Sequence, residues 1–381
     1  MYVTLKIQPK VAQLTFDDII NGIGINSLQS EVGNRSDTRT TVYAKTPEKL
    51  LEVVNIEQKI KILEAFNEKH KDLIETADKK TLYFSFTIPK RSGGLRPIDA
   101  PLPPLMSALV ELRHIFEREL FANYHTAAFA YIKGRDVKSC MQKHQANHSR
   151  WFLKTDLKNF FGSTTPEFMK KQLKMIFPYN EIYALPHGET ALDTALSLCF
   201  LNGGLPQGTP ISPLLTNLMM IPIDHEISRF CRKHTPHICY TRYADDIDLT
   251  SDISFKWTEV KQEILDILSK FEAPFRLNEE KTRYASSSGR NWNLGIMLNK
   301  DNDLTIGHRR KKRLKAKIFT FMNDFIKGDY WDIGDTQELQ GEIAWCRHIE
   351  KENADKIVQT YSTKFNLDVT TFIKNLIKNE F

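Results

Sequence analysis

Two adjacent aspartates between two short β-like segments constrain the fold of this chain more than any other feature. Asp245 and Asp246 follow residues 238–243 and precede residues 247–250. A buried carboxylate without a partner costs several kcal/mol, so such a pair must lie at a turn or be compensated by cations. The pattern predicts a hairpin with both carboxylates at its tip. A solvated Asp-Asp turn and a metal-binding tip both fit this pattern.

A third carboxylate, Asp156, ends another predicted strand, residues 151–156. A sheet that aligned these strands would bring three carboxylates to one point, where they repel one another unless divalent cations neutralise them. Mg²⁺ binds few carboxylates and keeps positions free for phosphate oxygens and water. Two such ions about 4 Å apart stabilise the attacking and the leaving oxygen in phosphoryl transfer. The sequence therefore predicts two Mg²⁺ ions at this cluster.

Composition sets the outer limits. The 381 residues are 41% hydrophobic and 26% charged, as in soluble globular proteins, and are enough for two or three lobes. The sequence contains no apolar run of about 18 residues, which argues against a membrane span, and its start lacks the pattern of a secretory signal. Five scattered cysteines do not form a disulfide framework, so a cytoplasmic location is expected. The net charge of +6 permits an anionic partner.

Strands and helices alternate along the middle of the chain, which predicts an α/β or α+β fold. A basic hairpin is expected over residues 81–98. Helices are expected over residues 104–120, 165–176 and 190–201, and one apolar helix is expected from 213 to 231.

Three motifs occur in the order and at the spacing seen in reverse transcriptases. They are residues 154–161 (Lys-Thr-Asp-Leu-Lys-Asn-Phe-Phe), 205–213 (Leu-Pro-Gln-Gly-Thr-Pro-Ile-Ser-Pro) and 243–246 (Tyr-Ala-Asp-Asp). Residues 88–98 also resemble the fingers hairpin of the bacterial branch, which includes retron enzymes, defence-associated reverse transcriptases and group II intron proteins. The resemblance covers about residues 80–320.

The resemblance implies an α+β right-hand polymerase fold, with an antiparallel palm sheet backed by helices. It divides the chain into a helical N-terminal extension (1–78), fingers and palm (79–299) and a helical thumb (300–381). Residues 130–144 resemble a segment of retron enzymes, but Cys140 and Met141 stand where those enzymes have Asn-Ala. This departure favours a neighbouring defence-associated lineage.

The resemblance also implies roles for the acidic motifs. Asp156 and Asp245 would hold both metal ions together with the Leu157 carbonyl, and Asp246 would complete the cluster. Phe161 matches the steric gate, a ring that clashes with a ribose 2′-hydroxyl and so favours deoxynucleotides. Its alternative role is that of a core aromatic.

Four further side chains match substrate-binding positions of the family. Arg96 matches the arginine that binds the triphosphate, and Lys90 lies on the same basic hairpin, although such a hairpin can also be a solvated edge. Gln207 would line the incoming nucleotide, or is a loop residue before a helix. Lys281 resembles the lysine near the leaving pyrophosphate, a candidate general acid, or is a surface lysine.

A basic run follows residues 293–297, which resemble the primer-grip hairpin. It contains seven Lys and Arg side chains and no acid, and Leu314, Ile318 and Phe321 continue it at helical spacing. A thumb helix with one cationic side would contact the duplex backbone, whereas a charge run is otherwise a solvated face. The predicted nucleic-acid contacts are Arg309, Arg310, Lys311, Lys312, Arg313, Lys315 and Lys317.

A cluster of cysteines and histidines offers an alternative, a zinc site. Cys231, His234, His237 and Cys239 lie within nine residues, but their spacing matches no common zinc finger.

The expected function is RNA-directed DNA synthesis from dNTPs on an RNA template, a structured noncoding RNA, in bacterial antiphage defence. The partners are that RNA, the DNA product and the dNTPs, with no membrane; an oligomer or an effector protein stays open. Three rivals remain: a template-independent or protein-primed polymerase of the abortive-infection type, a group II intron-like reverse transcriptase, and a catalytically silent RNA-binding scaffold.

Overall fold

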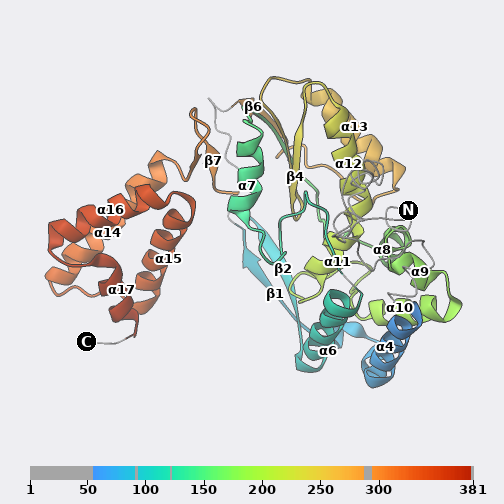
Figure 1. The fold of residues 1–381 in the computed structure, drawn as a ribbon. Helices are drawn as coiled ribbons and strands as arrows, with labels where there is room; N and C mark the ends of the chain where they lie inside the picture. Colours follow the sequence, from blue (N-terminus) through green and yellow to red (C-terminus); the bar gives the residue numbers. More distant parts are fainter. Residues whose placement is uncertain (1–54, 91–92, 121, 287–293, 379–381) are drawn as a thin grey trace, which may run out of the picture. The chain divides into compact units, whose positions relative to one another are not determined.

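The computed structural model describes residues 55–90, 93–120, 122–286 and 294–378. It separates into two compact units (Figure 1). The first contains the described residues up to Gly134 together with Lys154–Leu249 and Lys256–Arg283. The second contains Arg135–Leu153, Thr250–Phe255 and the described residues from Tyr284 onward. Most of the predicted extension, residues 1–54, lies outside the described residues.

A four-stranded sheet carries the acidic motifs, with strand order β4-β5-β3-β6. These strands are β3 (Trp151–Asp156), β4 (Cys239–Tyr243), β5 (Asp246–Ser251) and β6 (Arg283–Ser286). Strands β3 and β5 run antiparallel, because the Arg150 amide bonds the Ser251 carbonyl at one end and the Leu157 amide bonds the Asp245 carbonyl at the other. The predicted hairpin around the two aspartates and the predicted strand 151–156 are confirmed.

Amphipathic helices back this sheet. Helix α12 (Ile221–Lys233) packs against β4 and against α13 (Trp257–Lys270) and buries Ile223 and Ile227. The single helix expected over 213–231 is wrong: α11 (Ser212–Met219) ends two residues before α12 begins. The reason is Pro222, which has no amide hydrogen to continue the helical ladder and therefore starts a new helix.

The remaining helices of the first unit pack around these. They are α4 (Ile56–Lys69), α5 (Lys71–Ile74), α6 (Pro103–His114), α8 (Pro166–Leu173), α9 (Tyr179–Tyr183) and α10 (Pro186–Ser197). Helix α10 begins four residues before the expected start at 190, because Pro186 is a favourable first helical residue. The helix expected over 104–120 changes to a π-helix after His114.

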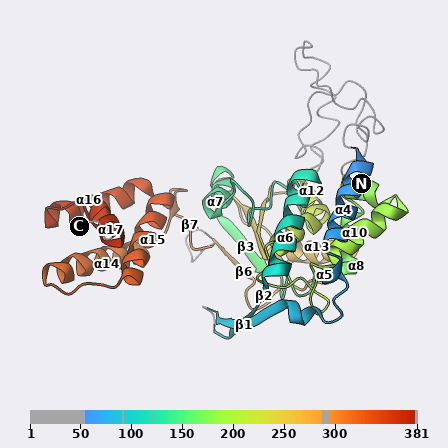
Figure 2. The same ribbon diagram turned by 90° about the horizontal axis from the view of Figure 1, so that it is seen from below.

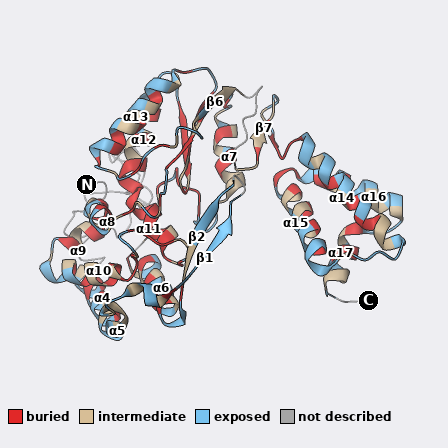
Figure 3. Ribbon diagram, turned by 180° about the vertical axis from the view of Figure 1, so that it is seen from behind, coloured by how far each residue is buried: buried red, intermediate tan, exposed pale blue. Residues whose placement is uncertain are grey.

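The predicted basic hairpin is β1 (Tyr83–Pro89) paired antiparallel with β2 (Leu95–Pro101), in a register that places Ile88 opposite Arg96. Strand β1 is mostly exposed, and β2 is exposed at its start and becomes more buried toward Pro101 (Figure 3). Every second residue of a strand shares a face, so Phe84, Phe86 and Ile88 form one exposed apolar row.

The second unit is mainly helical. Its elements are α7 (Val137–Ala146), β7 (Met297–Leu298), β8 (Leu304–Thr305), α14 (His308–Ile326), α15 (Ile333–Ile349), α16 (Lys351–Phe365) and α17 (Val369–Lys378). Figure 2 shows α14 to α17 packed as one bundle. Their apolar faces meet in a core that includes Leu314, Ile318 and Leu339.

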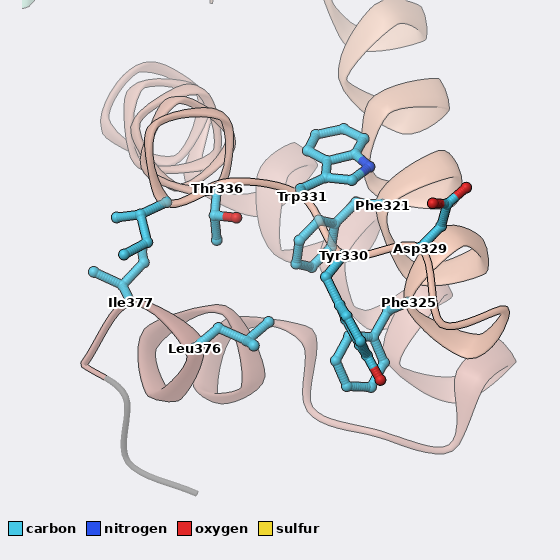
Figure 4. Close-up of a pocket in the computed structure, with 9 residues that line it drawn as sticks. Phe321, Phe325, Asp329, Tyr330, Trp331, Thr336, Leu376 and Ile377 are labelled. Carbon is cyan, nitrogen blue, oxygen red and sulfur yellow. The ribbon is translucent and has the colours of Figure 1, made fainter.

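An aromatic-lined pocket of about 160 Å³ lies in this bundle, between α14, α15, α17 and the connection that carries Tyr330 and Trp331 (Figure 4). The Trp331 indole donates a hydrogen bond to Asp324 at 3.0 Å and fixes one wall. Among the described residues, no helix is both long and apolar enough to cross a membrane.

Candidate active site

The three predicted aspartates converge where β3 ends and the β4–β5 hairpin turns. The Leu157 amide, one residue beyond Asp156, donates to the Asp245 carbonyl at 3.0 Å, so the two chain segments are hydrogen-bonded at the cluster itself. Asp156 is buried, with 3% of its surface exposed, and Asp245 and Asp246 are half-buried. The antiparallel register thus places carboxylates that are about ninety residues apart in sequence at one end of the sheet.

Burial and mutual repulsion outweigh the nearby cations at two of the three carboxylates. Burial raises the pKa of Asp246 to about 7, and repulsion by Asp245, Asp248 and Asp156 adds to this shift. Burial also raises the pKa of Asp245, with repulsion by Asp156, whereas its own backbone amide, Lys281 and Arg96 act in the opposite direction. A cation bound at this point would reduce the repulsion among all three carboxylates.

Lys281 forms an ion pair with this cluster. Its Nζ donates to Asp156 Oδ2 at 2.7 Å, and this hydrogen bond is the main reason that the Lys281 pKa is raised. The turn that carries it is pinned to the end of β3, because the Asn278 amide donates to the Asp156 carbonyl at 2.9 Å and the Lys281 amide donates to the Asn278 carbonyl. The structure therefore places Lys281 at the candidate site.

The oxygen donors of the three carboxylates suit a divalent cation, although their side chains are not arranged as a closed metal site. Over the described residues, no group of three His, Cys, Asp or Glu side chains lies close enough to hold a metal ion. Asp156 Oδ1, however, is buried and has no hydrogen-bond partner among the described residues. A buried carboxylate oxygen without a partner is costly, and hard oxygen donors of this kind are what Mg²⁺ prefers.

Phe161 lies beside the Gly-rich turn that follows α10. Its backbone carbonyl accepts hydrogen bonds from the amides of Leu205 at 3.0 Å and Thr164 at 3.1 Å. A Cβ added to Gly204 would lie 2.2 Å from the Gly162 carbonyl oxygen, so only glycine permits this approach. Phe161 itself is half-buried.

The basic hairpin docks on the same turn. The Asp99 amide of β2 donates to the Gln207 carbonyl at 2.8 Å, and Gly208 has a positive φ of 118° with no room for a Cβ beside Asp99. Arg96 is exposed. Burial raises the pKa of Asp245, and the positive charge of Arg96 acts against this rise, so Arg96 is close enough to interact with the cluster. Lys90 lies exposed at the hairpin turn, where its amide bonds the Gly94 carbonyl.

Two residues near the site were missed by the sequence analysis. Tyr131 has a positive φ of 63°, is 57% exposed, and meets the Phe161 ring edge-on at 6.5 Å between ring centroids. Lys154 is two residues before Asp156, on the same face of β3, and burial lowers its pKa to about 8. The only sequence signal for either was its place within a matched motif.

The basic run divides into paired and free cations on α14. Lys311 bonds Glu350 at 2.8 Å, Lys317 bonds Glu338 and Glu342 at 3.0 and 3.1 Å, and Arg310 donates to the Gly295 carbonyl at 2.6 Å. Arg313 lies 3.7 Å from Glu342 but stays exposed. Three more are exposed and lie in no ion pair of the described residues: Arg309, Lys312 and Lys315.

The zinc alternative receives no support from the geometry. The described residues, which include Cys231, His234, His237 and Cys239, contain no group that could hold a metal ion. His234 Nδ1 instead lies 2.8 Å from the Pro236 carbonyl, and Cys231 and Cys239 are buried thiols.

Comparison with known proteins decides the family. A family model described as "Reverse transcriptase (RNA-dependent DNA polymerase)" matches residues 88–321, which is more than half of the chain. The chain belongs to the reverse transcriptase family. Its relatives include the Retron Ec83 reverse transcriptase of Escherichia coli, 27% identical over 76% of this chain and 90% of the relative. The Retron Mx162 reverse transcriptase of Myxococcus xanthus is 30% identical over 58% of this chain and 48% of the relative.

Among solved structures, apo telomerase from Candida tropicalis matches with a TM-score of 0.47 and 11% identity, covering 93% of this chain and 74% of that one. The expected family and the α+β fold of a right-hand polymerase with an antiparallel sheet are confirmed. The chain is an RNA-directed DNA polymerase of retron-like type.

Proposed function

We propose that this reverse transcriptase extends a primer with dNTPs on an RNA template, using two Mg²⁺ ions held by Asp156, Asp245, Asp246 and the Leu157 carbonyl. The observation that carries this proposal is the convergence of three carboxylates at the end of β3, with Asp156 Oδ1 buried and unpartnered among the described residues. The ions would supply the charge that stabilises the attacking and leaving oxygens of nucleotidyl transfer.

The surrounding side chains would bind and orient the nucleotide. Arg96, supported by Lys90, would neutralise the triphosphate, because a guanidinium matches phosphate oxygens in a bidentate manner. Lys281 stays protonated beside Asp156 and would donate its proton to the leaving pyrophosphate. Phe161 would contact the sugar, and Gln207, whose carbonyl is already held by Asp99, would turn its side chain to the base.

The raised pKa of Asp246 predicts how pH and Mg²⁺ affect stability. The group titrates near pH 7 when folded and near its ordinary 3.8 when unfolded. Its stabilising contribution is therefore complete at low pH and is lost as pH rises through 7. Burial is the largest cause of this shift in pKa; repulsion by Asp245, Asp248 and Asp156 adds to it, and Lys281 opposes it.

Mg²⁺ should restore that loss, because it binds the ionised cluster. We expect 10 mM Mg²⁺ to raise Tm by roughly 3 °C at pH 8 and by less than about 1 °C at pH 5.5, measured by differential scanning fluorimetry. The Asp246→Asn variant should show a smaller Mg²⁺ effect and a weaker fall of Tm between these pH values. Equal Mg²⁺ shifts at both pH values in both proteins would argue against a metal site here.

Helix α14 would bind the template-primer duplex through its unpaired cations, without reading sequence. Replacing Arg309, Lys312 and Lys315 with alanine should weaken binding and flatten the log–log salt dependence of the dissociation constant by about 2 to 3 units, because each lost phosphate contact removes nearly one released counterion.

The matched control for this variant is Lys317→Ala. Lys317 lies on the same helix, but its charge is held by Glu338 and Glu342. This control should lower Tm and leave the salt slope within about 0.5 units of wild type. A control with the same slope change as the triple variant would contradict the assignment of the phosphate contacts to the exposed cations alone.

We extend the proposal to the biological setting: a cytoplasmic bacterial enzyme that copies a structured noncoding RNA in antiphage defence. The similarity to retron reverse transcriptases supports it. The test is to purify the protein with its bound nucleic acid and to sequence the RNA and any attached DNA. One defined RNA with DNA complementary to it supports the proposal. DNA with no templating RNA would favour the abortive-infection type, and intron RNA would favour the group II intron type.

A further inference from the structure

A buried arginine contacts the turn that carries Asp245. Arg242 of β4 is completely buried, and so is its partner Asp224 of α12. The guanidinium Nη2 lies 2.8 Å from Asp224 Oδ2, and Nε lies 2.9 Å from Oδ1. The Tyr240 hydroxyl adds a third hydrogen bond to Asp224, at 2.6 Å. The arginine is thereby neutralised and held from one side.

The remaining nitrogen of this guanidinium contacts the turn itself. Arg242 Nη1 donates to the Ala244 carbonyl at 3.0 Å. Ala244 has a positive φ of 58°, a conformation that is unfavourable for any residue with a Cβ and that persists only when its surroundings enforce it. A bidentate ion pair that leaves one donor for a strained carbonyl is a means of enforcing that conformation.

The Ala244 carbonyl and the Asp245 amide belong to one planar peptide group, so fixing the carbonyl also fixes the amide. Burial raises the pKa of Asp245, and that amide acts in the opposite direction on the carboxylate of its own residue. One rigid peptide unit therefore connects the buried guanidinium to the carboxylate. The next carbonyl, that of Asp245, is fixed separately by the Leu157 amide.

The backbone of Arg242 is fixed as well. Its amide donates to the Ala127 carbonyl at 2.7 Å, and its carbonyl accepts from the Phe129 amide at 2.9 Å. Arg242 is thus attached to α12 by its side chain and to residues 127–129 by its main chain. Because Arg242 is held at both its side chain and its main chain, it restricts the conformation of the turn that it contacts.

We propose that Arg242 is a positioning residue for polymerisation: paired with Asp224, it sets the conformation of the turn that aims the Asp245 carboxylate at the metal ions. Arg242 touches no reacting atom and acts only through the Ala244–Asp245 peptide. This inference rests on the proposed role of Asp245, and the Asp245→Asn variant tests that role separately.

The test uses Arg242→Lys and the charge-neutral double variant Arg242→Gln with Asp224→Asn. Lysine keeps the charge but cannot bind Asp224 in a bidentate manner and still reach Ala244. The double variant removes the buried charge as a pair, so that neither partner is left as an unpaired ion. Both are assayed for Tm, for kcat and KM of dNTP addition per folded molecule, and for the Mg²⁺ concentration at half-maximal rate.

We expect a fall in kcat of roughly 10- to 100-fold and an increase of several-fold in the Mg²⁺ requirement, with the dNTP KM within about threefold of wild type. The stability control is Leu192→Ala, a fully buried leucine of α10. It should lower Tm while kcat per folded molecule is unchanged.

Variants of Arg242 that lose Tm but keep kcat and Mg²⁺ dependence would overturn the inference and leave Arg242 a purely structural residue. If Asp245→Asn is active, the proposed site fails. If Asp245→Asn is inactive while the Arg242 variants are fully active, only the positioning role fails.

Discussion

Replacing Asp245 with asparagine should reduce the rate of primer extension by at least about 10³-fold. A metal ion held by this carboxylate would supply several kcal/mol of transition-state stabilisation, and about 4 kcal/mol corresponds to that factor. The effect should appear in kcat rather than in template-primer affinity, because the exposed cations of α14 lie on a different unit. Single-nucleotide incorporation under saturating dNTP measures it.

The same variant should keep its fold. Burial and the neighbouring Asp156 raise the pKa of Asp245, so the neutral amide removes repulsion, and Tm in the absence of Mg²⁺ should not fall. Asp266→Asn, on an exposed position of α13, is the matched control and should retain full activity. An active Asp245→Asn enzyme would exclude this cluster as the catalytic centre.

Replacing Phe161 with alanine should reduce the preference for dNTPs over rNTPs by up to about 100-fold. A 2′-hydroxyl forced against a fixed ring costs about 1–3 kcal/mol, and removing the ring makes that space available. The ring is well placed to be rigid, since Tyr131 meets it edge-on and its own carbonyl is bound by two amides. Ratios of kcat/KM for dGTP and GTP measure the change.

Phe168 is the control for this variant. It is buried and packs against Phe275, with ring centroids 5.4 Å apart, so Phe168→Leu should lower stability without altering sugar selectivity. If Phe161→Ala keeps the wild-type ratio, the ring is a core aromatic, the alternative that the sequence left open.

The elements nearest the chemistry were those that could be predicted best. The strand ending at Asp156 and the hairpin around Asp245 were correct, because alternation and turn residues act over a few positions. The helix boundaries were less accurate: Pro222 divided one expected helix and Pro186 moved another. Proline fixes the local backbone, but whether it breaks a helix or begins one depends on what the helix packs against.

The second unit shows a different limit. The sequence pointed to seven cations of one kind, and the structure separates them by the acidic residues that α15 and α16 bring to them. Lys311 is held by Glu350 and Lys317 by Glu338, across 39 and 21 positions of sequence. Charge runs do not reveal such partners, because an ion pair depends on which helix packs alongside.

The sequence by itself determined the candidate site of this protein: three carboxylates in recognisable motifs, their order, and the strand and hairpin that carry them. These are local properties, set by residue type and short-range backbone preference. Only the tertiary structure decided that Lys281 contacts Asp156, that Tyr131 meets Phe161, and that Arg242 joins Asp224 to the catalytic turn. Each of these contacts joins residues far apart in the chain or buries a charge. Long-range contacts and charge burial both depend on tertiary packing, which a short stretch of sequence does not determine.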